Sequence, residues 1–143
     1  YFTTPLKYYF ADIGLRNARL NFRQVEETHI MENIIYNDLI RRGYNVDIGV
    51  IEYTQTKENK NRKIQLEVDF VVNRGNIRYY IQSALTLDSA EKREQEINSL
   101  KRIDDSFKKI VIVKDDIIPR YDEQGIYYIG VKDFLLTNSI FEN

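Results

Sequence analysis

The stretch that most constrains the fold is "EVDFVVNRGNIRYYIQSA", which covers residues 67–84. It holds two runs in which apolar residues recur with the period of strands that bury one face. Between them lies "NRGN", a short sequence that favours a hairpin turn. The two runs are therefore expected to pair as antiparallel strands of one sheet.

Side chains alternate between the two faces of a strand. Glu67, Asp69 and Val71 are thus expected to share one face of the first strand. Gln82 and Ala84 are expected to share one face of the second. Whether the two sets meet depends on where the chain turns.

Three turns are compatible with this sequence. A two-residue turn at Gly75-Asn76 places Asp69 directly opposite Gln82, on the same face. A turn at Arg74-Gly75 pairs Glu67 with Gln82 instead, and a three-residue loop breaks the match.

Patterns on either side of the hairpin predict the rest of the fold. A helix from about Val25 to Arg42 carries a broad apolar stripe that includes Ile40, and Gly43 ends it. A strand, "YNVDIGVIEYT", follows. After the hairpin come a helix that starts at Asp88, the strands "KKIVIVK" and "IYYIG", and a closing helix, "VKDFLLT". This order predicts an α/β fold, a mixed sheet of about five strands flanked by helices.

The chain is expected to form one domain over residues 25–143, with residues 1–24 as a lead-in segment that docks on it. It has no Cys, which excludes disulfides and thiolate zinc sites. It shows neither a membrane-span run nor a signal peptide, and a cytoplasmic location fits. Because it lacks an initiator Met, it is expected to be a fragment of a longer protein.

The net charge of −1 argues against binding nucleic acid by overall charge alone. Any DNA contact must come from a local patch or a partner domain. The connection over residues 55–63 offers Lys57, Lys60, Arg62 and Lys63, which suit phosphate contacts. A solvated hairpin connection is the simpler interpretation of the same residues.

Oxygen-bearing side chains on the strands also suggest a metal site. Mg²⁺ prefers carboxylate and carbonyl oxygens, which Asp69 and Gln82 supply. Glu32, at the edge of the helical apolar stripe, offers a third oxygen donor. The alternative is structural: the three residues are a packed polar cluster without metal, and each buried carboxylate then needs a partner or a proton.

This arrangement resembles the PD-(D/E)XK nuclease fold. More narrowly, the chain resembles an uncharacterised C-terminal domain carried by many prokaryotic AAA-type P-loop ATPases. The matching stretches are "KYYFADIGLRNARL", "MENIIYNDLIRRGYNVDIG", "EVDFVV", "YYIQSA" and "VKDFLL", which together span nearly the whole chain. The resemblance implies an upstream ATPase module, and this sequence itself has no phosphate-binding loop motif.

The resemblance assigns Glu32 to the helix carboxylate of the nuclease fold and Asp69 to its central metal-binding Asp. Gln82 stands where the Glu of the Glu-x-Lys pair belongs, and Ala84 where the Lys belongs. Loss of such an electrostatic donor typically lowers the rate by about 10²–10³. No other lysine of the sequence is evidently placed to replace it.

The expected function is therefore a degenerate nuclease module of an ATPase that binds DNA or protein, with weak or no catalysis and no cofactor. One alternative is a Mg²⁺-dependent DNase that uses Glu32, Asp69 and Gln82, with its positive charge supplied from elsewhere. A second alternative is an oligomerisation module that pairs copies of the ATPase.

Overall fold

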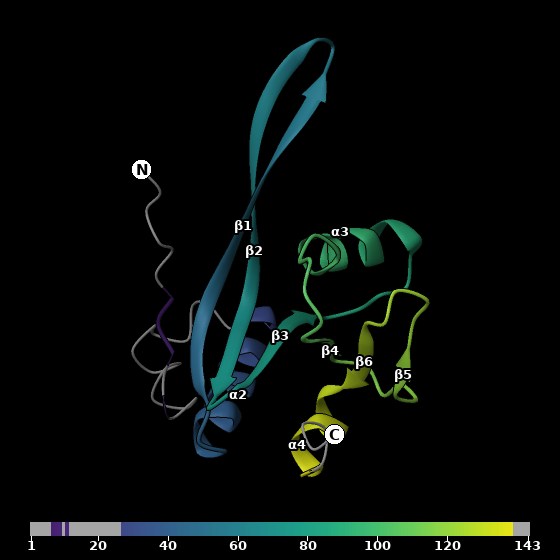
Figure 1. Cartoon of the computed structure of the whole chain (residues 1–143). Coiled ribbons are helices and arrows are strands. Elements are labelled where there is room, and N and C mark those ends of the chain that lie inside the picture. The colour runs from purple at the N-terminus through teal and green to yellow at the C-terminus, as the bar shows by residue number, and fades with distance from the viewer. Residues whose placement is uncertain (1–6, 10, 12–26, 139–143) are drawn as a thin grey trace, which may run out of the picture.

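A computed structural model describes residues 7–9, 11 and 27–138 of the chain (Figure 1). Its elements run in this order along the chain: α2 (Glu27–Arg41), β1 (Asn45–Lys57), β2 (Lys60–Arg74), β3 (Ile77–Ala84), α3 (Ala90–Lys101), β4 (Lys108–Val113), β5 (Arg120–Tyr121), β6 (Tyr127–Gly130) and α4 (Val131–Leu136). This is the α/β class that the sequence predicts.

The strands form one six-stranded mixed sheet in the order β1-β2-β3-β4-β6-β5. The first three strands are an antiparallel meander. Helix α3 then crosses over, so that β4 lies parallel to β3, and β6 lies parallel to β4. The sheet has one strand more than expected, because Arg120–Tyr121 pairs antiparallel with β6 inside a predicted loop.

Helices cover both faces of the sheet (Figure 1). On one face α2 and α4 pack through a cluster that includes Met31, Ile35, Leu39 and Phe134. On the other face α3 packs through Ile97 and Leu100. Strand β4 is buried on both sides, which explains its continuous run of β-branched residues.

The β2–β3 hairpin has the two-residue turn at Gly75-Asn76. Arg74 pairs with Ile77, and Gly75 has a positive φ, a conformation that glycine reaches without strain. The register continues to Phe70 opposite Ile81, where the regular pairing ends. Asp69 and Gln82 are the next two residues across from each other.

The β1–β2 hairpin is longer than the sequence suggests. Its strands continue to Lys57 and Lys60, so most of the predicted connection over residues 55–63 is strand. Only Glu58 and Asn59 form the loop, both with positive φ, as a type I′ turn requires. The two strands extend well beyond the rest of the sheet as an arm (Figure 1), because β2 pairs with β3 only as far as Phe70. We call residues 50–67 of this arm the ribbon.

Two helix details differ from expectation. Helix α3 begins one residue after Ser89, whose side chain accepts a hydrogen bond from the Lys92 N–H, so Ser89 and not Asp88 is its cap. In α2, Ile40 is 46% exposed and does not belong to the buried stripe. The start of that helix at Val25 lies outside the described residues.

Most of the predicted lead-in segment also lies outside the described residues. Of residues 1–24 the structure describes 7–9 and 11. Tyr9 stacks on Tyr36 of α2 with 4.2 Å between ring centroids and packs against the α2-side core. This contact brings Lys7 to the sheet.

Candidate functional site

A bulge in β2 determines where Asp69 points. Asp47 pairs with Val71 and Gly49 with Val68, so that two residues of β2, Asp69 and Phe70, lie opposite one residue of β1. Val68 packs on the α3 side of the sheet, whereas Phe70 packs on the α2 side. The predicted alternation therefore fails after Asp69.

The bulge corrects one predicted set of neighbours. Glu67 and Asp69 do share a face, because both contact Lys7, but Val71 packs on the opposite, α3 side. Gly49 permits this close approach of β1: a Cβ there would lie 2.7 Å from Val71 Cγ2.

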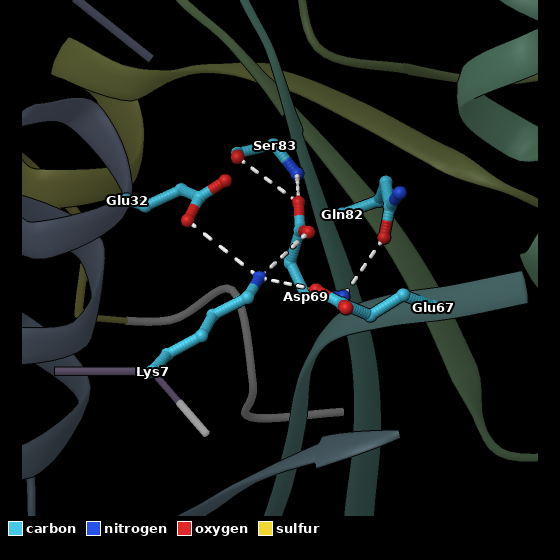
Figure 2. Close-up of polar contacts among 6 residues, drawn as sticks. All are labelled: Lys7, Glu32, Glu67, Asp69, Gln82 and Ser83. Carbon is cyan, nitrogen blue, oxygen red and sulfur yellow. Dashed lines mark hydrogen bonds and ion pairs between the residues drawn. The ribbon is translucent and has the colours of Figure 1, made fainter. Parts of the chain in front are cut away.

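The Lys7 ammonium lies among three carboxylates from two elements (Figure 2). Its Nζ is 2.5 Å from Glu67 Oε1, 3.5 Å from Asp69 Oδ1 and 3.7 Å from Glu32 Oε2. The Glu32 and Asp69 side chains are each 12% exposed, and that of Glu67 is 40% exposed. We call these four residues the carboxylate cluster.

The Asp69 carboxylate also closes the end of the β2–β3 pairing. Its Oδ2 accepts hydrogen bonds from the Ser83 N–H at 2.9 Å and from the Ser83 hydroxyl at 3.1 Å. The Gln82 amide oxygen accepts from the Asp69 N–H at 3.0 Å. Side chains thus replace backbone pairing at the point where β2 leaves the sheet for the ribbon.

Burial and the neighbouring charges both shift the pKa values of the cluster residues. Burial raises the pKa of Glu32, and the neighbouring Asp69 charge raises it further. Burial also raises the pKa of Asp69, although the Ser83 hydrogen bonds and Lys7 oppose the shift. For Lys7, burial alone would lower the pKa, but the hydrogen bond to Glu67 and the charges of Asp69 and Glu32 outweigh it and raise it.

The cluster borders an open cavity of about 460 Å³. The residues that line it come from the lead-in segment, α2 and β2: Lys7, Tyr8, Tyr9, His29, Glu32, Asn33, Glu67 and Asp69. The Tyr9 hydroxyl is buried with no hydrogen-bond partner in the described structure. This cavity is wide enough for a small polar ligand. The Lys7 ammonium lies between its carboxylates and offsets part of their negative charge.

The structure brings Glu32 and Asp69 together but places Gln82 differently. The strand neighbours of Gln82, Tyr80 and Ala84, pack on the α3 side, away from Lys7. In Figure 2 the Gln82 amide lies on the other side of Asp69 from Glu32. The Gln82 side chain contacts only the backbone N–H of Asp69, not its carboxylate. The predicted oxygen set Glu32–Asp69–Gln82 therefore does not converge on one point.

Within the described residues, no group of three or more His, Cys, Asp or Glu side chains has an arrangement that could hold a metal ion. Lys7 was missed by sequence reasoning, as was the role of Ser83. Lys7 belongs to a segment without strand or helix periodicity, and no spacing rule links it to Asp69, which is 62 residues away.

The four predicted phosphate-contacting residues lie at the outer end of the ribbon but not on one face. Lys57 pairs with Lys60, and Gln55 pairs with Arg62, so these cations follow Tyr53 and Ile64 on the α3 side. Lys63 belongs to the opposite face, where its Nζ is 3.7 Å from Glu52. The patch is thus three exposed cations on one face and a fourth that is ion-paired.

Comparisons with known proteins place this architecture in a family. The model of the family described as "Domain of unknown function (DUF4143)" matches residues 27–134. The chain belongs to the DUF4143 family. That match covers all six strands of the sheet and every described helix except the last two residues of α4. Lys7, whose ammonium fills the carboxylate cluster, lies before the matched region of the DUF4143 domain.

One curated relative is similar over nearly the whole chain. It is an "Uncharacterized protein" of Haemophilus influenzae (strain ATCC 51907 / DSM 11121 / KW20 / Rd), 31% identical over 140 residues. The alignment covers 95% of this chain but 30% of the relative, so the DUF4143 chain spans less than a third of that protein. No solved structure matches the chain. None of the described helices of the chain itself is long and apolar enough to cross a bilayer.

Proposed function

We propose that this DUF4143 domain is a DNA-binding module with weak or no catalysis. The observation that carries the proposal is the ribbon, a two-stranded arm that projects from the sheet with unpaired cations at its outer end. A two-stranded β-ribbon is one of the elements that the DNA major groove admits. Lysine and arginine side chains on it supply phosphate contacts that the net charge of −1 does not.

Weak catalysis follows from the state of the carboxylate cluster. Lys7 contacts all three carboxylates, and Ser83 takes the remaining Asp69 oxygen. A metal-dependent nuclease needs such oxygens for its ion. With Ala84 in place of the expected lysine and Gln82 turned to the α3 side, the cluster serves to join α2, β2 and the lead-in segment.

We further propose a restriction-endonuclease-like fold and an upstream ATPase module in the same cytoplasmic protein. The element order α, β, β, β, α, β supports the fold. The greater length of the Haemophilus relative leaves room for another module. The ATPase module would then be the principal partner of this domain, besides DNA.

The test of DNA binding is fluorescence anisotropy with a labelled 20-base-pair duplex over a series of salt concentrations. We expect salt-dependent binding that weakens in the double variant Lys60→Gln/Arg62→Gln, because each lost phosphate contact lowers the salt slope by about 0.9. No binding at low salt overturns the proposal. Concentration-dependent oligomers in the absence of DNA affinity would point to an assembly module instead.

One observation favours a second candidate, a divalent-metal-dependent DNase. Lys7 brings an ammonium within 3.5 Å of Asp69, and this is the group that Ala84 lacks. In that function Lys7 would orient the attacking water and stabilise charge on the phosphorane, while Glu32 and Asp69 would hold Mg²⁺. Plasmid cleavage in Mg²⁺ or Mn²⁺ that is abolished by both Lys7→Met and Asp69→Asn would establish it and sink the non-catalytic proposal.

A further inference from the structure

We propose, on the basis of the proposed DNA-binding function, that the domain holds duplex DNA against the α3 side of the ribbon. In this arrangement the Arg102 guanidinium at the end of α3 is a second phosphate anchor, beside the cations at the ribbon's outer end. The opposite face, which carries Lys63, does not contact DNA. We call Lys57, Lys60, Arg62 and Arg102 the basic strip.

The strand register puts three of these cations on one face. Residues directly opposite in an antiparallel pair share a face, and so do residues two apart along a strand. Lys57 lies opposite Lys60, and Arg62 is two residues further along β2. Two residues beyond, Ile64 lies opposite Tyr53, on the side of the sheet that α3 covers.

Arg102 continues this face at the base of the ribbon. Its Cζ lies 3.4 Å from the centroid of the Tyr53 ring, and its Nε donates to Asn98 Oδ1 at 3.2 Å. Stacking on an aromatic ring holds the guanidinium plane while leaving its edge free for oxygen acceptors. No ion pair engages Arg102 or the three ribbon cations among the described residues, in contrast to Lys63 with Glu52.

The spacing of the basic strip suits a duplex. Lys57 is four positions beyond Tyr53, a span of about 13 Å along an extended strand. This is close to the major-groove width of about 12 Å, so Arg102 and the outer cations can reach phosphates on the two groove edges. Single strands are usually held by exposed aromatic rings, but Arg102 already covers a face of Tyr53.

The experiment compares single variants of the whole chain by anisotropy, with a labelled 20-base-pair duplex and its isolated strand as probes. Arg62→Gln and Arg102→Gln should each weaken duplex binding by about three- to tenfold at moderate salt and lower the salt slope by about 0.9. Lys63→Gln is the matched control on the other face and should leave affinity within about twofold. Arg102→Lys should recover part of the affinity, and urea unfolding checks that each variant is folded.

The outcomes separate this inference from the proposed function. Equal losses in Lys63→Gln and Arg62→Gln, with binding intact in the unaltered chain, overturn the assignment of the face but leave DNA binding standing. So does tighter binding of the single strand than of the duplex. No binding of either probe by the unaltered chain overturns the proposed function and this inference together.

Discussion

The carboxylate cluster and the outer end of the ribbon both include residues of β2, but their charges have opposite surroundings. In the cluster, three carboxylates surround one ammonium, and the most distant of them is 3.7 Å from it. At the outer end of the ribbon, Lys57, Lys60 and Arg62 have no carboxylate partner among the described residues and are exposed to water. Removal of one partner from a partly buried ion pair leaves an uncompensated charge and is costly, whereas exposed unpaired charges contribute little to stability and remain available to a ligand.

The largest effect expected from this difference concerns Lys7. Lys7→Met leaves the carboxylates of Glu32, Glu67 and Asp69 without their cation. Removal of one partner from a fully buried ion pair costs about 3–5 kcal/mol. Glu67 is partly exposed, and solvent screening reduces the cost, so we expect a loss of about 2 kcal/mol at neutral pH. Urea unfolding measures it. The matched control, Lys57→Met, should change stability by less than about 0.5 kcal/mol, and equal effects in the two variants would contradict the comparison.

The same variant should change the pH dependence of stability. The native state raises the pKa of Glu32 and Asp69. Their contribution to the free energy of unfolding is therefore fully present below the ordinary carboxyl pKa of about 4, and it is lost as pH rises through the native pKa. Without Lys7 the opposing charge is gone and both pKa values rise further. The destabilisation by Lys7→Met should therefore be largest at pH 7–8 and shrink toward pH 5. A pH-independent difference in urea midpoints between pH 5 and 8 would rule this explanation out.

A smaller effect is expected where side chains replace backbone pairing. Gln82→Ala removes the acceptor of the Asp69 N–H and leaves that donor without a protein partner. An unsatisfied, partly buried N–H costs about 1–2 kcal/mol. Gln82→Glu keeps an acceptor oxygen and should lose less. Urea unfolding of both variants tests the point, and a larger loss in Gln82→Glu than in Gln82→Ala would show that this contact is not the one that matters.

The smallest expected change in stability is a gain rather than a loss, and it concerns Tyr9. Tyr9 stacks on Tyr36, but its hydroxyl is buried without a partner in the described structure, beside the cluster. Tyr9→Phe keeps the ring and removes the unsatisfied group, so we expect stability to be unchanged or to rise by up to about 1 kcal/mol. Thermal unfolding measures it, and a marked loss would mean that the hydroxyl has an acceptor in solution.

Local patterns predicted much of the fold. The period of the strands and the "NRGN" signal predicted the hairpin but left three turns open. The structure has the Gly75-Asn76 turn, whose register sets Asp69 across from Gln82. The helix and strand order was also readable, because each element carries its own apolar period. Strand β5 could not be predicted, because a strand of two residues shows no apolar period. The full length of β1 and β2 could not be predicted either, because their outer ends are polar.

The site was harder to predict for two physical reasons. The bulge at Asp69 and Phe70 reverses the alternation of side chains. Gly49 is a residue type that often accompanies a bulge, but it does not determine which residue of the neighbouring strand is inserted. Lys7 reaches the cluster from a segment distant in sequence, through the stacking of Tyr9 on α2. Glu32 and Asp69 were therefore found together, but the group that joins them was not.

The place of β1 at the edge of the sheet has a consequence for the solubility of the protein. From Asn45 to Lys57 its outer backbone donors and acceptors meet no other strand of the described sheet. Such an open edge is the usual template for the stacking of chains into fibres. Charged residues along this edge, Asp47, Glu52 and Lys57, interrupt its apolar positions, and the bulge adds local twist. These features let a long arm stay open to solvent while it discourages a neighbouring molecule from adding to it.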